Sequence, residues 1–156
     1  LRESGLPVRS VLAPPGLKFA ALLVTVEKGH PGIADRVVSV VRSSKMGVFF
    51  QYVMVTDEDV DVTNLPETMH AILAKTHPVN GVQIMELAPG HPLIPFSDLH
   101  DKLHSRGASL TFDGTTPVDW FADGQAPKRV SFKESYSQEI QDRVNAKWGE
   151  FGVVTG

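Results

Sequence analysis

The alternation of short apolar segments with amphipathic ones most limits what this chain can fold into. Residues 18–27 and 47–57 are mostly apolar, as expected of strands that are covered on both faces of a sheet. Residues 30–44 and 64–77 instead carry apolar side chains at helical spacing. Strands that alternate with helices predict an α/β fold, in which helices pack on a sheet.

Each predicted helix has local signals of its own. The first helix has Pro31 in its opening turn, and its apolar stripe is Ile33, Val37, Val40 and Val41. The second helix has Asn64 and Glu67 as a capping pair, and its stripe is Leu65, Met69, Ile72 and Leu73. A last helix opens near Ser135, with Gln138 as its capping partner and with Ile140, Val144 and Trp148 on one face. Further strands are predicted at residues 7–13, 81–87 and 108–112.

Size, charge and composition exclude several classes of protein. A chain of 156 residues fits one domain with a core of its own. Its net charge of -3 and lack of long basic clusters argue against nucleic-acid binding. No apolar run reaches the ~18 residues that cross a bilayer. The chain contains no cysteine, which excludes disulfides, a thiolate nucleophile and cysteine-ligated metals, and fits a cytoplasmic protein.

The first residues read as the end of a helix. LRESG is typical of a last helical turn closed by Gly5, and Pro7 follows soon after. A helix end without a preceding helix suggests that the chain is a fragment of a longer polypeptide.

Two loops are candidate ligand sites, because ligands of α/β sheets gather beyond the carboxyl ends of strands. One is the acidic loop after Val55, and the other is the loop rich in proline and glycine after Leu87. The acidic loop contains Asp57, Glu58, Asp59 and Asp61. Its DEDVDV pattern lacks the glycine and the distant glutamate of a calcium loop, so we interpret these carboxylates as lying at the solvent end of a buried strand, just before a helix N-terminus.

Histidine and lysine supply two further hypotheses. His100 and His104 are four residues apart and would share a helical face, where they could hold a metal with His91 or Asp101. The segment around them shows no clear helix, so loop histidines are the simpler interpretation. Lys45 stands in a short turn before a buried strand, where its ammonium group could reach a phosphate.

Several motifs, in the same order, resemble the C-terminal region of UbiD-type decarboxylases. In that family a strand ends in V-D-D-D-V-D-V and a helix follows, as in YVMVTDEDVDVTNLPETMHAILAKTHP. GHPLIPF and TPVDW are similar to G-F-P-L-I-P-Y and M-P-V-E-Y of the ferulic and cinnamic acid decarboxylase branch. The resemblance runs from GLPV to WGEFG, which is nearly the whole chain.

This resemblance implies an α/β fold with a mixed β-sheet flanked by helices, in a single domain over residues 1–156. The domain would be the C-terminal, pocket-closing and dimer-forming part of a cytoplasmic lyase, with residues 1–5 as the end of an interdomain helix. The family uses prenylated FMN, with manganese and potassium ions, to decarboxylate α,β-unsaturated or (hetero)aromatic acids reversibly. Its Glu-Arg-Glu catalytic set belongs to an N-terminal domain, so this chain would hold no catalytic residue and be inactive alone.

Three residues acquire roles through the resemblance. Lys45, in KMG, matches a family lysine that contacts the cofactor, which the N-terminal domain mainly binds. His91 and Leu93, in GHPL, match residues that line the substrate pocket. His91 replaces an aromatic residue and can form hydrogen bonds, so we expect a substrate more polar than cinnamate, such as a pyrrole, indole or furan carboxylate.

Two other interpretations remain open. The chain could be a non-catalytic binding or assembly module with the same fold, or a metal-binding protein built on His91, His100 and His104. The sequence does not name the exact substrate, the physiological direction of the reaction or the oligomer size.

Overall fold

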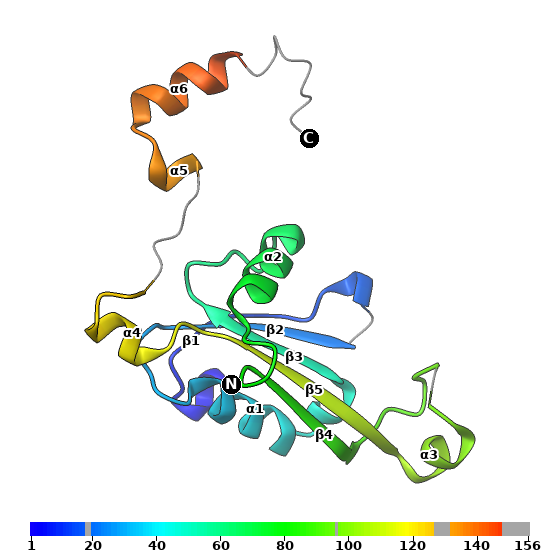
Figure 1. Ribbon diagram of the computed structural model, residues 1–156. Helices are drawn as coiled ribbons and strands as arrows, with labels where there is room; N and C mark the ends of the chain where they lie inside the picture. The colour runs from blue at the N-terminus through cyan, green and yellow to red at the C-terminus, as the bar shows by residue number, and fades with distance from the viewer. Residues whose placement is uncertain (18–19, 96, 127–131, 148–156) are drawn as a thin grey trace. The chain divides into compact units, whose positions relative to one another are not determined.

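A mixed five-stranded sheet forms the centre of the computed structural model, which describes residues 1–17, 20–95, 97–126 and 132–147 (Figure 1). The strand order is β1-β2-β3-β5-β4. β2, β3 and β5 run parallel, whereas β1 and β4 pair antiparallel at the two edges. The strands are β1 (Val8–Leu12), β2 (Ala21–Val26), β3 (Tyr52–Asp57), β4 (Val82–Pro89) and β5 (Arg106–Gly114). The predicted mixed α/β fold is confirmed.

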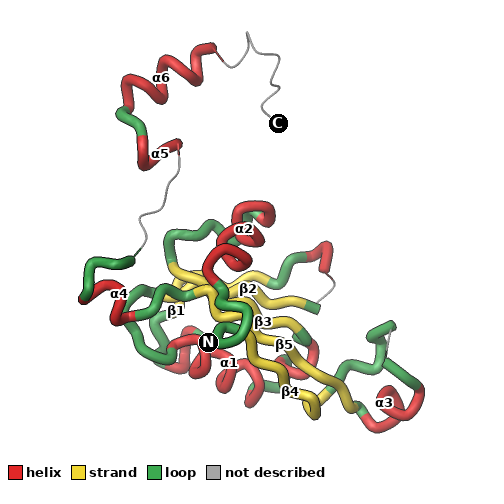
Figure 2. The backbone as a smooth tube through the Cα atoms, viewed as in Figure 1, coloured by secondary structure: helices red, strands yellow, loops and turns green. Residues whose placement is uncertain are grey.

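Two helices cover opposite faces of this sheet, α1 (Ile33–Ser43) and α2 (Leu65–Lys75) (Figures 1 and 2). The core on the α1 face includes Val37 of the helix and Val24 and Val53 of the strands. On the other face, Ile72 of α2 packs in one cluster with Leu23. All six residues of β2 are buried, as its apolar sequence predicts. Each leucine or valine side chain of this strand contributes about 1.5–3 kcal/mol when fully buried.

The two helices differ in detail from their predicted stripes. α1 begins at Ile33, after Pro31, and buries Ala34 and Val38, whereas Val40 is only half-buried. In α2 the Asn64 side chain accepts a hydrogen bond from the Glu67 backbone amide, so the predicted cap is confirmed. The predicted burial of Leu65 and Leu73 is wrong, since both are exposed and Thr68 is buried instead. The Thr68 hydroxyl is satisfied there by the Asp61 and Asn64 carbonyl oxygens, each at 3.0 Å.

The strand predicted over residues 47–57 begins only at Tyr52. A 3-10 helix, η3 (Gly47–Phe49), precedes it. Gly47 is pressed against the last turn of α1, where a Cβ atom would overlap the Val41 carbonyl oxygen. This contact bends the chain before it enters the sheet. Apolar character alone could not distinguish this buried turn from a strand.

The segment between residues 88 and 119 contains more regular structure than predicted. β5 is nine residues long, and two short helices, α3 (Leu99–His104) and α4 (Val118–Ala122), were not foreseen. α3 has no buried residue, so it carries no apolar stripe toward a core. A further 3-10 turn, η2 (Pro15–Leu17), lies between β1 and β2.

The chain divides into two compact units, Leu1–Gly124 and Gln125–Gly156. In the second unit α5 (Phe132–Ser135) is followed by α6 (Gln138–Lys147), which places Ile140 and Val144 at half-buried positions. Trp148, predicted on the same helical face, lies outside the described residues. A single domain over residues 1–156 stays a prediction.

The first residues form a short 3-10 helix, η1 (Arg2–Ser4), which Gly5 ends in the left-handed conformation at φ 71°. The predicted helical turn is confirmed, and its connection to another domain stays a prediction. Among the helices that the structure describes, none has the length and apolar character needed to cross a bilayer.

Candidate functional site

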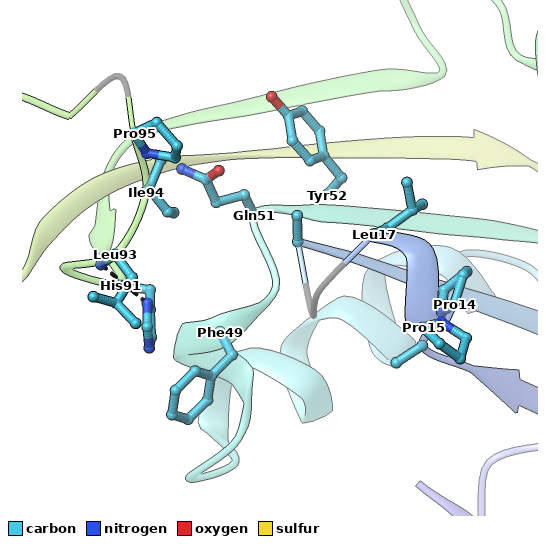
Figure 3. A pocket seen from close by; sticks show the side chains of 12 residues that line it. Pro14, Pro15, Leu17, Phe49, Gln51, Tyr52, His91, Leu93, Ile94 and Pro95 are labelled. Atoms are coloured by element: carbon cyan, nitrogen blue, oxygen red, sulfur yellow. Dashed lines mark hydrogen bonds between the residues drawn. The ribbon is translucent and has the colours of Figure 1, made fainter.

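A largely apolar cavity of about 920 Å³ lies at one end of the sheet (Figure 3). Three segments contribute lining residues: residues 13–17 and Ala20 between β1 and β2, residues 49–52 at the start of β3, and residues 91–95 after β4. Among the lining residues that the structure describes, none is Asp, Glu, Lys or Arg. The volume and apolar character are typical of a small-molecule site.

The sheet topology brings these segments together. β4 is antiparallel to β5, with Pro89 opposite Arg106, so the end of β4 lies beside the start of β5. β1 likewise ends where β2 begins, with Leu12 opposite Leu23. The cavity therefore lies where the parallel strands begin. Of the two predicted ligand loops, the loop after β4 lines it, whereas the acidic loop follows β3 at the opposite end of the sheet.

His91 is held in the cavity wall by its own loop and by an aromatic neighbour. The Leu93 backbone amide donates a hydrogen bond to His91 Nδ1 at 3.2 Å, drawn as a dashed line in Figure 3. The His91 and Phe49 ring centroids are 4.8 Å apart, and the ring planes are inclined by 44°. Leu93 is 81% exposed as a residue and also lines the cavity. The structure thus brings both predicted pocket residues into one wall.

Two glycines fix where this loop leaves the sheet. The Gly90 amide donates to the Ser105 carbonyl oxygen at 2.8 Å. A Cβ atom at Gly90 would overlap the Arg106 carbonyl oxygen, and one at Gly107 would lie 2.8 Å from the Gly90 Cα atom. The backbones therefore cross at a separation that only glycine permits. The sequence signal was the Pro89-Gly90 pair, but its partner at Gly107 is distant in the chain.

Arg42 holds in place the part of the wall that precedes β3. Its Nη1 atom donates to the Phe50 carbonyl oxygen at 2.5 Å and to the Gly47 carbonyl oxygen at 3.4 Å. Burial lowers the pKa of this guanidinium group from its ordinary value. Arg42 thus ties the end of α1 to the turn that carries Phe49. Sequence reasoning did not identify Arg42, because its two acceptors are main-chain atoms.

Lys45 lies in the turn between α1 and η3 and is exposed. It is not among the residues that line the cavity. Its side chain is therefore available to a group outside the chain, and its predicted contact with a cofactor stays a prediction.

The acidic loop contains a buried carboxylate. Asp57 is 1% exposed and accepts a hydrogen bond from Lys75 Nζ at 2.9 Å. The Thr116 hydroxyl donates to the same carboxylate at 2.6 Å, and the Thr116 amide donates at 3.2 Å. Asp57 thereby joins β3, α2 and the segment after β5. This geometry fits the interpretation as a strand end, although Asp57 lies in the interior rather than at solvent.

The other acidic residues of the loop also have partners within the protein. Asp59 contacts Lys28 at 2.9 Å and Lys75 at 3.6 Å. Burial raises the pKa of Asp59, but the Lys28 hydrogen bond and the two lysine charges outweigh burial, so its pKa is below the ordinary value. The Asp61 carboxylate accepts from the Thr63 hydroxyl and amide, which lowers its pKa.

The histidines do not gather as the metal hypothesis requires. His100 and His104 lie on α3, and their ring centroids are 4.3 Å apart. Among the described residues, the group with metal-ligand spacing is Asp98, His100 and Asp101, with ligand atoms within 4.8 Å of one another. It is exposed or half-buried and does not include His91. Asp98 also serves as the cap of α3, accepting from the Asp101 amide at 2.7 Å.

Comparison with known proteins gives one family and a set of similar folds. Residues 1–114 match the family described as the 3-octaprenyl-4-hydroxybenzoate carboxy-lyase C-terminal domain. The chain is 25% identical over 159 residues to the pyrrole-2-carboxylic acid decarboxylase of Pseudomonas aeruginosa, covering 97% of this chain and 32% of that protein. It therefore spans about one third of the length of this curated relative.

Solved structures show the same fold. The vanillic acid decarboxylase of Sedimentibacter hydroxybenzoicus in closed form has a TM-score of 0.72 at 24% identity, covering 93% of this chain and 29% of that one. The UbiD-class enzyme HmfF of Pelotomaculum thermopropionicum in complex with FMN has a TM-score of 0.67 at 18% identity, covering 86% and 29%. An evolved dimeric form of HmfF in complex with prFMN has a TM-score of 0.56 at 20% identity, covering 86% and 26%.

Proposed function

The chain belongs to the UbiD carboxy-lyase C-terminal domain family, and from this premise we propose that it is the C-terminal part of a reversible decarboxylase. Its substrates would be heteroaromatic or α,β-unsaturated carboxylic acids. The relative that is a pyrrole-2-carboxylic acid decarboxylase supports this reaction class. The observation that carries the proposal is the family match combined with a cavity that contains His91 and Leu93.

In this proposal the cavity binds the ring of the acid. Its apolar wall suits a flat ring, and the aromatic residues Phe49 and Tyr52 can pack against one. A volume of about 920 Å³ leaves room for a second bound group beside a small acid. The chain would therefore supply one wall of a shared site, while an N-terminal domain of the same polypeptide supplies the catalytic residues.

The second group would be prenylated FMN, and the residues present fit a flavin. The cavity is largely apolar, and the flat rings of Phe49, Tyr52 and His91 are among its lining side chains. Lys45 is exposed four residues before Phe49 in the chain. Lys45 would hold a phosphate as a point charge. When bound, this cofactor supplies the electron sink that decarboxylation needs. The HmfF structures that contain FMN and prFMN support the assignment.

The proposed partners follow from the same reasoning. The full-length enzyme would bind manganese and potassium with its cofactor, mainly through the N-terminal domain, and would form a homodimer or larger homo-oligomer. The evolved dimeric HmfF structure, which has the same fold, supports an oligomer.

The experiment uses the natural full-length polypeptide loaded with prenylated FMN. Wild type and His91→Phe are compared for their rates on pyrrole-2-carboxylate, furan-2-carboxylate and cinnamate. We expect His91→Phe to shift the ranking toward cinnamate, because Phe can pack but cannot form a hydrogen bond. His70→Phe, at an exposed position of α2 that does not line the cavity, is the matched control and should keep the wild-type ranking. An unchanged ranking in His91→Phe would contradict the assignment of His91 to the pocket.

A further inference from the structure

The hydrogen bond at His91 determines which ring nitrogen carries the proton. A backbone amide can only donate, so the Leu93 N–H group requires a lone pair on His91 Nδ1. A neutral imidazole has one protonated nitrogen, and with Nδ1 as acceptor the proton lies on Nε2. His91 in this loop is therefore a hydrogen-bond donor at Nε2. Without this contact, the same side chain could equally well present an acceptor to the cavity.

The ring is also fixed in place. The Phe49 ring packs against it, with the two ring centroids 4.8 Å apart. The loop that carries His91 begins where the backbones of Gly90 and Gly107 cross closely. Nε2 has no hydrogen-bond partner among the residues that the structure describes. Figure 3 shows the His91 ring beside Phe49, with Nδ1 facing the Leu93 amide and Nε2 on the other side of the ring. Because His91 lines the cavity and its Nδ1 atom is occupied by the Leu93 amide, Nε2 is the ring nitrogen that remains to donate to a ligand.

The rest of the wall cannot replace this donor selectively. Gln51 and Tyr52 are the other polar side chains of the described wall, and each can both donate and accept. They can adapt to either kind of ligand atom. His91 Nε2 can only donate a hydrogen bond. It therefore favours a ligand that presents an acceptor atom over one that presents an N–H group.

We propose that His91 selects acids whose ring presents a hydrogen-bond acceptor, such as furan carboxylates, over acids whose ring presents an N–H group, such as pyrrole carboxylates. The proposal rests on the proposed function, since it assumes that the cavity binds an acid. It distinguishes two ligand classes that the histidine residue type alone leaves equivalent.

The first test concerns the proton and needs no ligand. The 156-residue chain is labelled with ¹⁵N-histidine, and the tautomer is measured by long-range ¹H–¹⁵N correlation at about pH 8, where an imidazole is ordinarily neutral. The His91 signals are assigned by their loss in His91→Phe. We expect a protonated Nε2 and an unprotonated Nδ1. A protonated Nδ1 would overturn the proposal.

The second test concerns the ligand. Dissociation constants of furan-2-carboxylate and pyrrole-2-carboxylate are measured for the full-length, cofactor-loaded protein, since the two acids differ in whether the ring heteroatom accepts or donates. Wild type should bind the furan acid roughly three- to tenfold more tightly, as one hydrogen bond allows. His91→Phe should lose this preference. Equal affinities in wild type, or a preference for the pyrrole acid that His91→Phe abolishes, would overturn the proposal.

The two tests separate failure of the inference from failure of the proposed function. If the full-length protein binds none of furan-2-carboxylate, pyrrole-2-carboxylate and cinnamate, the proposed function is wrong, and so is the proposed ligand class. The tautomer measurement gives a result whether or not the acids bind, because the tautomer depends only on the hydrogen bond from the Leu93 amide. If the acids bind but without the expected preference, the proposed function stands and the selective role of His91 is wrong.

Discussion

Replacing Lys75 by methionine tests how much the buried carboxylate of Asp57 depends on its cation. Lys75 Nζ lies 2.9 Å from Asp57 Oδ2, and the Asp57 side chain is 1% exposed. Methionine keeps most of the aliphatic length of lysine and removes only the ammonium group. The variant therefore leaves an ionised carboxylate in the interior, held by the Thr116 hydroxyl and amide alone.

The expected loss can be estimated from this geometry. Removing one partner of a buried ion pair costs about 3–5 kcal/mol, because the other charge stays buried. Asp57 keeps two donors from Thr116, so the loss in free energy of unfolding should lie near the lower end, about 3 kcal/mol. Arg9→Met is the control. Arg9 pairs with Glu27 and Glu58 but its side chain is 58% exposed, and such pairs contribute only about 0–1 kcal/mol.

The assay is urea unfolding of the 156-residue chain at pH 7, followed by circular dichroism. The double variant Asp57→Asn with Lys75→Met should recover part of the loss, because a neutral amide replaces the uncompensated charge. If Lys75→Met is no less stable than Arg9→Met, then Asp57 does not depend on Lys75, and the account of this buried pair is wrong.

Two further variants test the cavity wall and the acidic loop. Gly90→Ala should destabilise the chain by about 1–3 kcal/mol and shift the Leu93 amide resonance, because the new Cβ atom would overlap the Arg106 carbonyl oxygen. Gly16→Ala is the control and should do neither, because a Cβ atom there meets open space. Equal effects of the two variants would contradict the close backbone approach of Gly90 and Gly107. Asp59→Asn should lower the free energy of unfolding at pH 7. The difference between wild type and variant should shrink as the pH falls through the lowered pKa of Asp59, because protonation then removes the charge of Asp59 in wild type too. A cost that grows on acidification in urea unfolding would contradict this sign.

Local patterns were sufficient for most of the central sheet and its two main helices. β2 is buried along its whole length, as its apolar run predicts, and Asn64 caps α2 through a contact three residues away. Leu65 and Leu73 were assigned wrongly to the core, because helical spacing does not show how far a helix is rotated toward the sheet. Thr68 lies inside instead, since two backbone carbonyl oxygens satisfy its hydroxyl.

The cavity was only partly predictable. His91 and Leu93 came from the family resemblance, whereas Phe49 and residues 13–17 reach the site through strand pairing that no local pattern reveals. The same holds for Asp57, whose partners Lys75 and Thr116 come from two other segments of the chain. α3 was missed because none of its six residues is buried, so it has no apolar stripe to detect.

The central claim is that this chain forms one wall of a decarboxylase site. The most direct measurement is carbon dioxide release by the natural full-length polypeptide, loaded with prenylated FMN and given heteroaromatic and α,β-unsaturated acids in turn. The account predicts one carbon dioxide released for each acid consumed, from at least one heteroaromatic acid. Absence of release from every acid, by a polypeptide shown to hold the cofactor, would contradict it.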